Sequence, residues 1–275
     1  MKLFLLLCML ISNTKLNRKL NGMITSLSER ERELLTLLAE DSTISVNDIS
    51  ASLNVSAVTI RHDLNSLSDK GFIIRTRGGA LPTFHPNILS RQREQVDQKA
   101  KIAKAAAGMV QDGDTIMIEA GTTLSLIARY FLGKRDIHIV TSSTLIIPYA
   151  RINPAIHLTV VGGSFRPLTE SLVGPVALKE LEQFHVKYAF VGTDGFSMEN
   201  GLTTHLVEGA EILKKMASQA QKTICVADSS KYGKAGFVKV LPLSEISILI
   251  TDSNLKPDIA GKIEKAGVEV LRIEN

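Results

Sequence analysis

The sequence predicts an α/β chain of two domains: a small helical domain that ends in a β-hairpin, and a larger domain built around a mostly parallel sheet. Two observations lead to this prediction. Before residue 82, three amphipathic stretches each follow a serine suited to cap a helix. After residue 99, short runs rich in β-branched residues alternate with amphipathic stretches, which is the order of a parallel sheet covered by helices on both faces.

Length and composition agree with two enclosed cores, because 275 residues with 44% hydrophobic content are ample for both. Four of the 32 basic residues lie in the first 22 residues, which contain no acid, so 28 basic residues remain against 28 acidic ones. The net charge of +4 therefore gives no indication of nucleic-acid binding. Cys8 and Cys225 have no ligand at metal spacing, which favours reduced thiols in a cytoplasmic protein over a disulfide or a zinc site.

Residues 1–22 include an apolar run, MKLFLLLCMLIS, of the kind found in secretory signals. The run is too short to span a bilayer, and no convincing cleavage site follows it. We expect residues 1–22 to be an extended or non-native start, with Met23 as the natural first residue. A membrane tether is the competing interpretation.

The front domain is predicted over residues 23–82, beginning with a helix from Ser28 to about Glu40. Ser28 and Glu31 have the spacing of a capping box, and leucines supply the apolar face of the helix. A second, shorter helix is expected to begin after Ser45, which can accept from its free N–H groups.

A tight turn then leads into a third helix capped by Ser56, so that a helix-turn-helix covers about residues 43–62. The inward face of this helix carries Ile60, Leu64 and Leu67 at positions i, i+4 and i+7. A helix in this place in the motif is the one that enters the major groove of DNA. The residues left free to meet DNA are Ser56, Ala57, Thr59, Arg61, His62 and Asn65.

A basic hairpin follows, with a strand from Phe72 to Arg77 and a turn at Gly78-Gly79. Two Ser-capped helices alone are as consistent with simple core packing as with a DNA-binding module. Arg75 and Arg77 beside the glycines favour a winged helix-turn-helix on DNA, because cations gather where phosphates would lie. These cations are Arg61, Lys70, Arg75 and Arg77.

The stretch VSAVTIRHDLNSLSDKGFIIRTRGGALP resembles the helix-turn-helix signature of the DeoR family of bacterial repressors. In that signature, Thr-Ile-Arg opens the recognition helix and Gly-Gly-Ala follows the wing. His62 stands where the family usually carries a second arginine, a difference that weakens a phosphate or guanine contact.

Residues 83–98 show no sustained period and are expected to be a linker. Helical spacing returns from Lys99 to Val110, and an α/β domain is predicted over residues 99–275. The expected strands cover residues 115–118, 137–140, 158–161, 188–191, 223–227, 246–250 and 268–273.

Polar motifs follow five of these strands, at the sheet edge where ligands collect in α/β folds. After the first strand, Gly121 allows close backbone approach and two threonines offer hydroxyls, as in a phosphate cradle. One such motif is often an ordinary helix cap, but five at one edge favour a site for a polyhydroxylated phosphate ester. Lys231 would add a positive charge there, and Asp194 would accept from sugar hydroxyls.

The same motifs match the C-terminal sensor domain of the DeoR family, so the resemblance covers almost all of residues 28–275. It implies a fold similar to ribose-5-phosphate isomerase and a sugar phosphate or related metabolite as inducer. Glu119 stands where the family mostly has Asp, and Ser142 where it mostly has Asn. The resemblance places effector contacts at Gly121, Thr122, Thr123, Ser142, Ser143, Gly162, Gly163, Asp194, Thr203, Thr204, Glu208 and Lys231.

An isomerase-like enzyme is the chief rival interpretation. After Asp194-Gly195 the lysine and glycine run of those isomerases is missing, and only Glu199 remains as a nearby acid. A serine-nucleophile elbow is also missing, and five histidines lack ligand spacing. We therefore expect no catalytic residues, no metal and no cofactor. The histidines are His85, His138, His157, His185 and His205.

Together these features predict a transcriptional repressor of a sugar or polyol catabolic operon, released from DNA by a phosphorylated sugar or polyol. An activator of the same family is the alternative. The expected partners are operator DNA, the effector and further copies of the chain in a dimer or tetramer, because a single head has a small DNA interface. Contact with a membrane is not expected.

Overall fold

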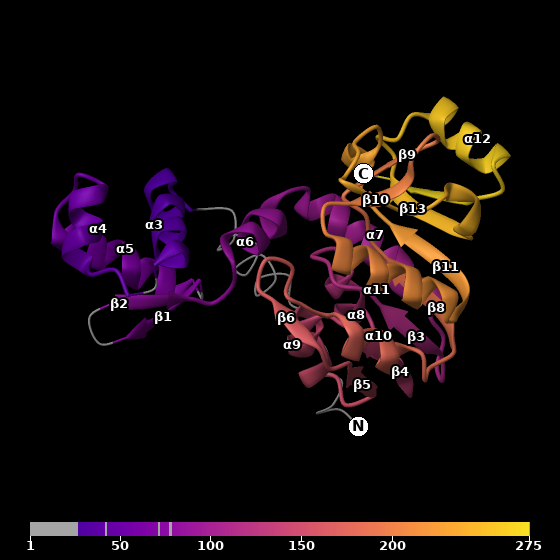
Figure 1. Cartoon of the computed structure of the whole chain (residues 1–275), viewed down its shortest axis with the longest axis horizontal. Helices are drawn as coiled ribbons and strands as arrows, with labels where there is room; N and C mark the ends of the chain where they lie inside the picture. The colour runs from indigo at the N-terminus through magenta and orange to yellow at the C-terminus, as the bar shows by residue number, and fades with distance from the viewer. Residues whose placement is uncertain (1–26, 42, 71, 77–78, 275) are drawn as a thin grey trace, which may run out of the picture. The chain divides into compact units, whose positions relative to one another are not determined.

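The computed structural model describes residues 27–41, 43–70, 72–76 and 79–274, which divide into two compact units on either side of the Arg93–Glu94 bond. Both units are drawn in Figure 1. The expectations for residues 1–22 and for Arg77 lie outside the described residues. Among the residues that are described, no helix has the length and apolar character needed to cross a membrane.

Within its described residues, the front unit contains three helices, then a two-stranded antiparallel hairpin and a fourth helix (Figure 1). In the hairpin, Thr76 pairs with Gly79, so Gly79 is the first residue of the second strand rather than part of the turn at Gly78-Gly79 that the sequence predicted. The winged helix-turn-helix predicted from the sequence is therefore confirmed as a fold. Its elements are α3 (Glu29–Glu40), α4 (Val46–Ser52), α5 (Ala57–Asp69), β1 (Ile73–Thr76) and β2 (Gly79–Pro82).

Each of the three helices begins at its predicted cap. Ser28 Oγ accepts from the Glu31 amide at 3.2 Å, while the Glu31 carboxylate accepts from the Ser28 amide at 2.8 Å. Ser45 and Ser56 cap α4 and α5. The apolar side chains that these helices bury together include Leu34, Leu38, Ile49, Ile60, Leu64 and Leu67.

Charged side chains join α3 to α5. Arg30 donates twice to Asp63, from Nε to Oδ2 at 2.6 Å and from Nη2 to Oδ1 at 3.1 Å. Glu31 Oε1 accepts from Ser66 Oγ and from Lys70 Nζ, both at 2.8 Å. Because both carboxylates are buried, these contacts fix the position of α5 against α3.

The structure differs from the expected linker at residues 83–98, which contain helix α6 (Pro86–Arg93). Ile88 and Leu89 are buried, and Leu89 belongs to the same core as the three capped helices. Adjacent apolar residues in so short a segment create no helical period, so the sequence pattern did not predict this helix.

The second unit is built around a seven-stranded parallel sheet in the order β14-β13-β11-β8-β3-β4-β5. Each strand overlaps a run predicted from the sequence, so the mostly parallel α/β fold is confirmed. The strands are β3 (Thr115–Ile118), β4 (Ile137–Thr141), β5 (Ile156–Val160), β8 (Val186–Val191), β11 (Ala220–Val226), β13 (Ile248–Asp252) and β14 (Glu269–Ile273).

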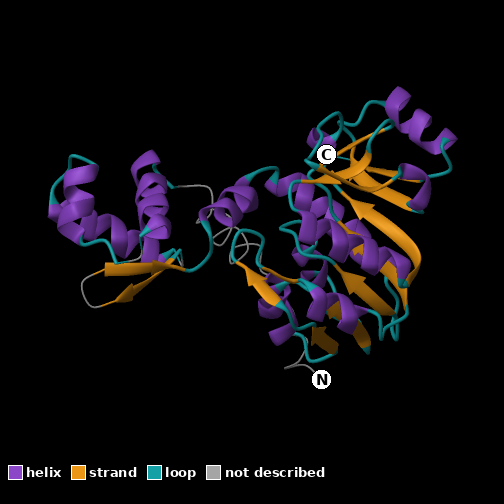
Figure 2. Ribbon diagram, in the orientation of Figure 1, coloured by secondary structure: helices purple, strands orange, loops and turns teal. Residues whose placement is uncertain are grey.

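Helices cover both faces of this sheet, as Figure 2 shows. Successive strand residues point to opposite faces, so Ile116 and Met117 belong to different cores. The core of Ile116 includes side chains of α7 (Val96–Met109), α8 (Ser125–Arg129) and α9 (Ile147–Arg151). The core of Met117 includes side chains of α10 (Pro175–Leu181), α11 (Val207–Ser218) and α12 (Pro257–Lys265).

Two small antiparallel sheets were not predicted from the sequence, because their strands are too short to carry a recognisable alternation. Short 3₁₀ helices were missed for the same reason: η1 (Thr144–Ile146), η2 (Ser229–Lys231) and η3 (Leu243–Glu245). The extra strands are β6 (Ser164–Arg166), β7 (Ser171–Val173), β9 (Gly195–Ser197), β10 (Gly201–Thr204) and β12 (Val238–Leu241).

The chain order of the large sheet reverses between β3 and β8. From β3 the chain continues to β4 and β5 on one side, and then crosses to β8, β11, β13 and β14 on the other. In open α/β sheets, ligands bind outside the carboxyl ends of the strands at such a reversal. The loops after β3 and β8 are therefore the first place to look for a ligand site.

Candidate functional site

The outward face of α5 is an exposed row formed by Val58, Arg61, His62 and Asn65. These positions are spaced i, i+3, i+4 and i+7, so they lie along one side of the helix. Val58 is 73% exposed although it is apolar. An arginine and an asparagine can read guanine and adenine edges, and an apolar side chain can contact a thymine methyl group.

The first turn of α5 is organised by two hydroxyls. Ser56 Oγ accepts from the Thr59 amide at 3.1 Å, and the two side-chain oxygens lie 2.8 Å apart. Ser56 is exposed, whereas Ala57 and Thr59 are half-buried. Of the predicted DNA-facing residues, Ser56 and Thr59 thus also build the helix start.

The wing carries Arg75 on β1, where its side chain is exposed beside Ile74. Lys70, by contrast, does not lie free to meet phosphates as the sequence predicted. Its ammonium group donates to the buried Glu31 carboxylate at 2.8 Å, and its side chain is only 19% exposed. No sequence pattern indicated this pair, because Glu31 and Lys70 are distant along the chain.

At the carboxyl edge of the large sheet, the loops after β3 and β8 are joined by Glu119. Its Oε2 accepts from the Gly192 amide at 2.9 Å, and its own amide donates to the Phe190 carbonyl at 3.0 Å. A Cβ at Gly121 or at Gly192 would press on the Leu124 side chain, at 3.3 and 3.2 Å. The structure thus brings the predicted phosphate cradle to the point of chain reversal.

The neighbouring loop, after β4, contains two buried serines. Ser142 and Ser143 are 1% and 0% exposed, and their hydroxyls have no hydrogen-bond partner among the described residues. Their backbones are fixed, since the Ser142 carbonyl accepts from the Leu172 amide and the Ser143 amide donates to Thr141 Oγ1. A buried hydroxyl without a partner is costly unless another molecule supplies one.

Asp194 and Thr204 are brought together beyond β8. Asp194 Oδ2 accepts from Thr204 Oγ1 at 2.9 Å and from the His205 amide at 3.0 Å. The Asp194 carboxylate, in the loop after β8, therefore joins the chain before β9 to the end of β10. Both side chains are half-buried.

Thr203 has a different environment from the one predicted for an effector contact. It is 1% exposed, its hydroxyl donates to the Gly195 carbonyl at 2.8 Å, and the same oxygen accepts from the Gly236 amide at 2.8 Å. The Thr203 hydroxyl is thus already hydrogen-bonded within the fold. The burial of β10 was not predicted, because so short a strand shows no recognisable sequence alternation.

Gly162 and Gly163 follow β5, at the edge of the sheet. The Gly162 amide donates to the Glu180 carboxylate at 2.6 Å. Gly163 has φ +138°, and a Cβ there would lie 2.6 Å from the Val173 carbonyl oxygen. Both glycines therefore serve the packing of the β6–β7 hairpin against α10.

Glu208, in the first turn of α11, pairs with Arg166 of β6. The hydrogen bond and the charge of Arg166 hold the pKa of the Glu208 carboxyl below its ordinary value. Both side chains remain partly exposed, so the pair is accessible to a charged ligand.

Lys231 lies in η2, in the loop after β11, and is half-exposed. This loop is anchored by two buried acids. Asp228 accepts from the Ser230 amide at 3.2 Å, and Asp252 accepts from the Ser229 amide at 2.7 Å. Because β11 and β8 are adjacent parallel strands, the loop that carries Lys231 and the loop after β8 leave the same edge of the sheet.

Comparison with known proteins identifies the family of each of the two domains. Residues 30–82 match the DeoR-like helix-turn-helix domain, and residues 94–253 match the DeoR C-terminal sensor domain. This chain belongs to the DeoR family. The resemblance recognised in the sequence is thereby confirmed.

Curated relatives of this DeoR-family chain extend over most of its length. The HTH-type transcriptional regulator GlpR of Haloferax volcanii is 35% identical over 89% of this chain and 97% of that protein. The HTH-type transcriptional repressor GlcR of Bacillus subtilis is 34% identical over 90% of this chain and 96% of that protein. Ribose 5-phosphate isomerase A of Methanocaldococcus jannaschii is a weak structural match, with 20% identity, a TM-score of 0.38, and coverage of 50% of this chain and 55% of that one.

Three residues of this DeoR-family chain were missed among the predicted site residues. Val58 was passed over because apolar residues are usually assigned to the core, although its position is off the inward face of α5. In the sequence, Glu119 stands out only as a departure from the family pattern. In the structure, its carboxylate joins the loops after β3 and β8, at the point where the strand order reverses. Arg166 follows the two glycines after β5 closely in the sequence, but its pairing with Glu208 depends on the fold.

Proposed function

We propose that this DeoR-family chain is a transcriptional repressor of a sugar or polyol catabolic operon. In this proposal, α5 and the wing bind operator DNA, and a phosphorylated sugar or polyol binds at the carboxyl edge of the large sheet and releases the protein. The observation that carries the proposal is the exposed row of α5, whose side chains are of the kinds that can contact base edges. The opposite side of α5 packs within the domain, where Asp63 accepts hydrogen bonds from Arg30 of α3.

The DNA-binding residues we propose divide into two groups. Arg61 and Asn65, with Val58, would contact base edges in the major groove, because they project from the outward side of the helix. Ser56 and Arg75 would contact phosphates, which position the protein without reading sequence. Ala57, Thr59, His62 and Arg77 complete the proposed interface.

For the effector we propose a position over the loops after β3, β4, β8 and β11. The backbone around Gly121 and the hydroxyls of Thr122 and Thr123 would hold the phosphate, with Lys231 adding a positive charge. The unpartnered hydroxyls of Ser142 and Ser143 would find their acceptors or donors on the ligand. Asp194 and Thr204 would meet sugar hydroxyls.

Three of the predicted effector contacts receive a smaller role in this proposal. Thr203, Gly162 and Gly163 are engaged within the fold, so we assign them to the support of the site. We keep Glu208 among the proposed effector contacts, because a phosphate group would compete with its carboxylate for Arg166.

Release from DNA requires that the effector bind two states of the protein with different affinity. We propose that the protein acts as a homo-oligomer, dimer or tetramer, whose heads are spaced for two half-sites only in the effector-free state. A repressor acts where the chromosome is, so we propose a cytoplasmic location.

The test begins with a thermal-shift screen of the full chain against sugar phosphates and the matching unphosphorylated sugars. A phosphorylated ligand should raise the unfolding midpoint, whereas its sugar should not. The same ligand should weaken retention of duplex DNA from the region upstream of the chain's own gene, measured by gel shift at fixed salt.

Two outcomes would contradict the proposal. One is failure to prefer the upstream duplex over unrelated DNA at any salt concentration. The other is conversion of the bound sugar phosphate to its isomer, which would favour the isomerase-like interpretation instead. Footprinting on operator DNA with and without the ligand separates a repressor from an activator. A repressor that the effector releases loses its footprint when the effector binds, whereas an activator that depends on the effector keeps it.

A further inference from the structure

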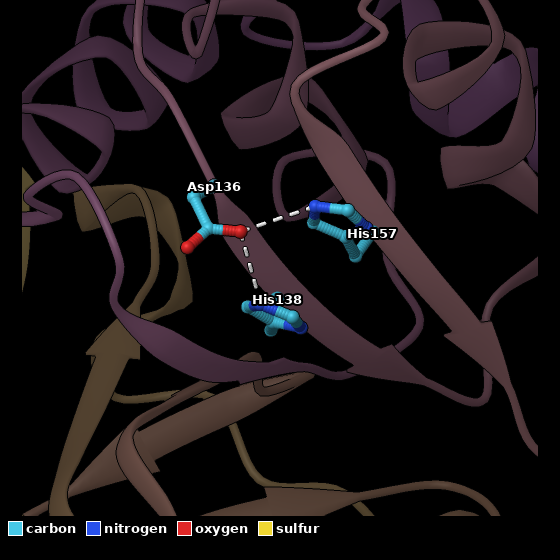
Figure 3. Close-up of side chains that lie close together, drawn as sticks. All are labelled: Asp136, His138 and His157. Carbon is cyan, nitrogen blue, oxygen red and sulfur yellow. Dashed lines mark ion pairs between the residues drawn. The ribbon is translucent and has the colours of Figure 1, made fainter.

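Three side chains that the effector site does not use come together at the amino ends of β4 and β5: Asp136, His138 and His157 (Figure 3). Asp136 precedes β4, and the two histidines are directly opposite each other in the register of the two parallel strands. Side chains at such paired positions project from the same face of a sheet. The two histidines are distant in sequence, which is why spacing predicted no metal site.

The three side chains are close enough to share one ion. His138 Nε2 lies 3.2 Å and His157 Nε2 lies 3.1 Å from the same oxygen, Asp136 Oδ1. All three ligand atoms lie within 4.8 Å of one another. The imidazole rings are stacked, with centroids 4.5 Å apart and planes 15° from parallel. Figure 3 shows both rings turned toward the carboxylate.

These distances match what a tetrahedral metal ion requires. Zinc bonds to histidine nitrogen and carboxylate oxygen are about 2.0 to 2.1 Å long, which places tetrahedral ligand atoms about 3.3 Å apart. The two nitrogen-to-oxygen separations are within a few tenths of an ångström of this value. An ion that replaces the two Nε2 protons can therefore be held with small side-chain movements.

The backbone around the cluster is well fixed, although its side chains are half or more exposed. The Arg135 amide donates to Asp112 at 2.9 Å, and the His138 amide donates to the Asp114 carbonyl at 3.0 Å. Asp136 itself has φ +56°, a left-handed conformation that places its carboxylate beside the strand ends. Fixed backbone and paired strands are the conditions that hold metal ligands at constant spacing.

The cluster is distinct from the candidate effector site. It lies at the amino ends of the parallel strands, whereas Ser142 and Ser143 follow the carboxyl end of the same strand, β4. None of its three residues contributes to the buried cores. A role for it thus does not depend on the proposed function of the chain.

The geometry points to a surface site for a divalent transition metal ion such as Zn²⁺, with His138, His157 and Asp136 as its protein ligands. Two imidazoles and one carboxylate form a donor set that suits zinc and its neighbours rather than magnesium or calcium. Three protein ligands leave at least one coordination position for water or for a donor from another molecule. The site binds metal less tightly than a closed four-ligand structural site.

The test is calorimetric titration of Zn²⁺ into the untagged full chain carrying Cys8→Ser, which removes a competing thiol. One Zn²⁺ per chain is expected, and it should raise the unfolding midpoint, because the ion binds the folded state. His138→Ala and His157→Ala should each weaken binding by at least about tenfold, since each removes a ligand. Co²⁺, titrated as a spectroscopic substitute, should show visible absorption that both variants lose.

His185→Ala is the matched control, because it removes an exposed histidine of the same unit outside the cluster. It should bind Zn²⁺ as the parent does. The proposal is overturned if the parent binds Zn²⁺ no more tightly than the His138→Ala/His157→Ala double variant, or if His185→Ala loses binding equally. Circular dichroism monitors folding of every variant, and His157→Gln replaces any alanine variant that does not fold.

Discussion

Glu119 Oε2 accepts a hydrogen bond from the Gly192 amide at 2.9 Å, across the point where the order of the parallel sheet reverses. The contact is tight, because a Cβ at Gly192 would lie 3.4 Å from that carboxylate oxygen and 3.2 Å from the Leu124 side chain. The loops that follow β3 and β8 are therefore held together before any ligand arrives. Preformed loops lower the ordering cost of binding.

Glu119→Ala removes this acceptor, and we expect it to weaken effector binding. A hydrogen bond to a charged group contributes about 1.5 to 3 kcal/mol, which corresponds to roughly tenfold or more in affinity. Operator binding should stay close to the wild-type value, since the change lies in the other unit. Calorimetry with the sugar phosphate found by thermal shift measures the first effect, and gel shift measures the second. Glu199→Ala, which removes an exposed acid of the same unit, should alter neither.

Arg61→Ala should weaken operator binding by about tenfold or more. An arginine that contacts a base edge contributes roughly 1 to 3 kcal/mol to the discrimination between the correct and the wrong base pair. Effector affinity should be unchanged. Arg151→Ala removes an exposed arginine from the other unit and is the matched control. Loss of both activities in Arg61→Ala would argue against the separation of DNA reading from effector binding.

The salt dependence of the same variant identifies what Arg61 contacts. If the guanidinium meets a base, Arg61→Ala should relax sequence preference and leave the slope of log affinity against log salt unchanged. A phosphate contact would instead make that slope less steep by about 0.9. We expect the first result, because Arg61 lies in the middle of the exposed row of α5 with Val58 and Asn65.

Lys231→Ala should give the opposite phenotype to Arg61→Ala: a repressor that binds DNA but responds poorly to its effector. The lysine is half-exposed on a loop held by two buried acids, so its removal takes away charge without disturbing the fold. Dose–response curves for release from DNA should shift to higher effector concentration. Lys234→Ala, an exposed lysine nearby in the same loop, should leave the curve in place.

Local chemistry explains what the sequence could predict. Ser28, Ser45 and Ser56 each lie one residue before a helix, and the cap is a contact within four residues. The seven strands of the large sheet could be predicted because each is a short run that contains β-branched residues. Order along the chain then predicted parallel pairing and the loops at one edge.

The rest depends on contacts between distant segments. Glu31 has two functions, as capping-box acid and as partner of Lys70, and only the first has a sequence pattern. The burial of individual threonines could not be predicted either, since Thr203 and Thr204 are adjacent but only Thr203 is fully buried. The pairing of His138 with His157 required the register of β4 and β5.

The pair of Glu31 with Lys70 should make the stability of the front unit depend on pH. Burial opposes ionisation of Glu31, but hydrogen bonds from Lys70, Ser28 and Ser66 outweigh it and hold its pKa below the ordinary value. The folded state thus releases this proton more readily than the unfolded state. Its stabilisation is present above the unfolded pKa and is lost as pH falls through the folded pKa.

Glu31→Gln should therefore destabilise the front unit at pH 7, by roughly 1 to 3 kcal/mol for a charged hydrogen bond in a buried place. The difference in unfolding free energy between variant and wild type should narrow as the pH falls through the lowered pKa of Glu31 in the folded state. Urea unfolding followed by circular dichroism at several pH values measures both, with Glu33→Gln on the exposed side of α3 as control. A gap that stays constant with pH would mean that ionisation of Glu31 contributes nothing.

Gly201 permits β10 to approach β12 closely enough to carry Thr203 and Thr204 to the candidate effector site. It has φ +65°, and a Cβ there would lie 2.1 Å from the Leu241 carbonyl oxygen, a distance no real contact reaches. Gly201→Ala must therefore displace β12 or unwind the start of β10, and overpacking of this kind costs about 1 to 3 kcal/mol or more.

Gly261→Ala is the opposite case, because nothing lies within 4 Å of its Cβ position inside α12. Alanine there should stabilise the fold by up to about 1 kcal/mol. Chemical denaturation of the full chain compares the two, and equal stability of Gly201→Ala and wild type would mean that β10 does not approach β12 as described.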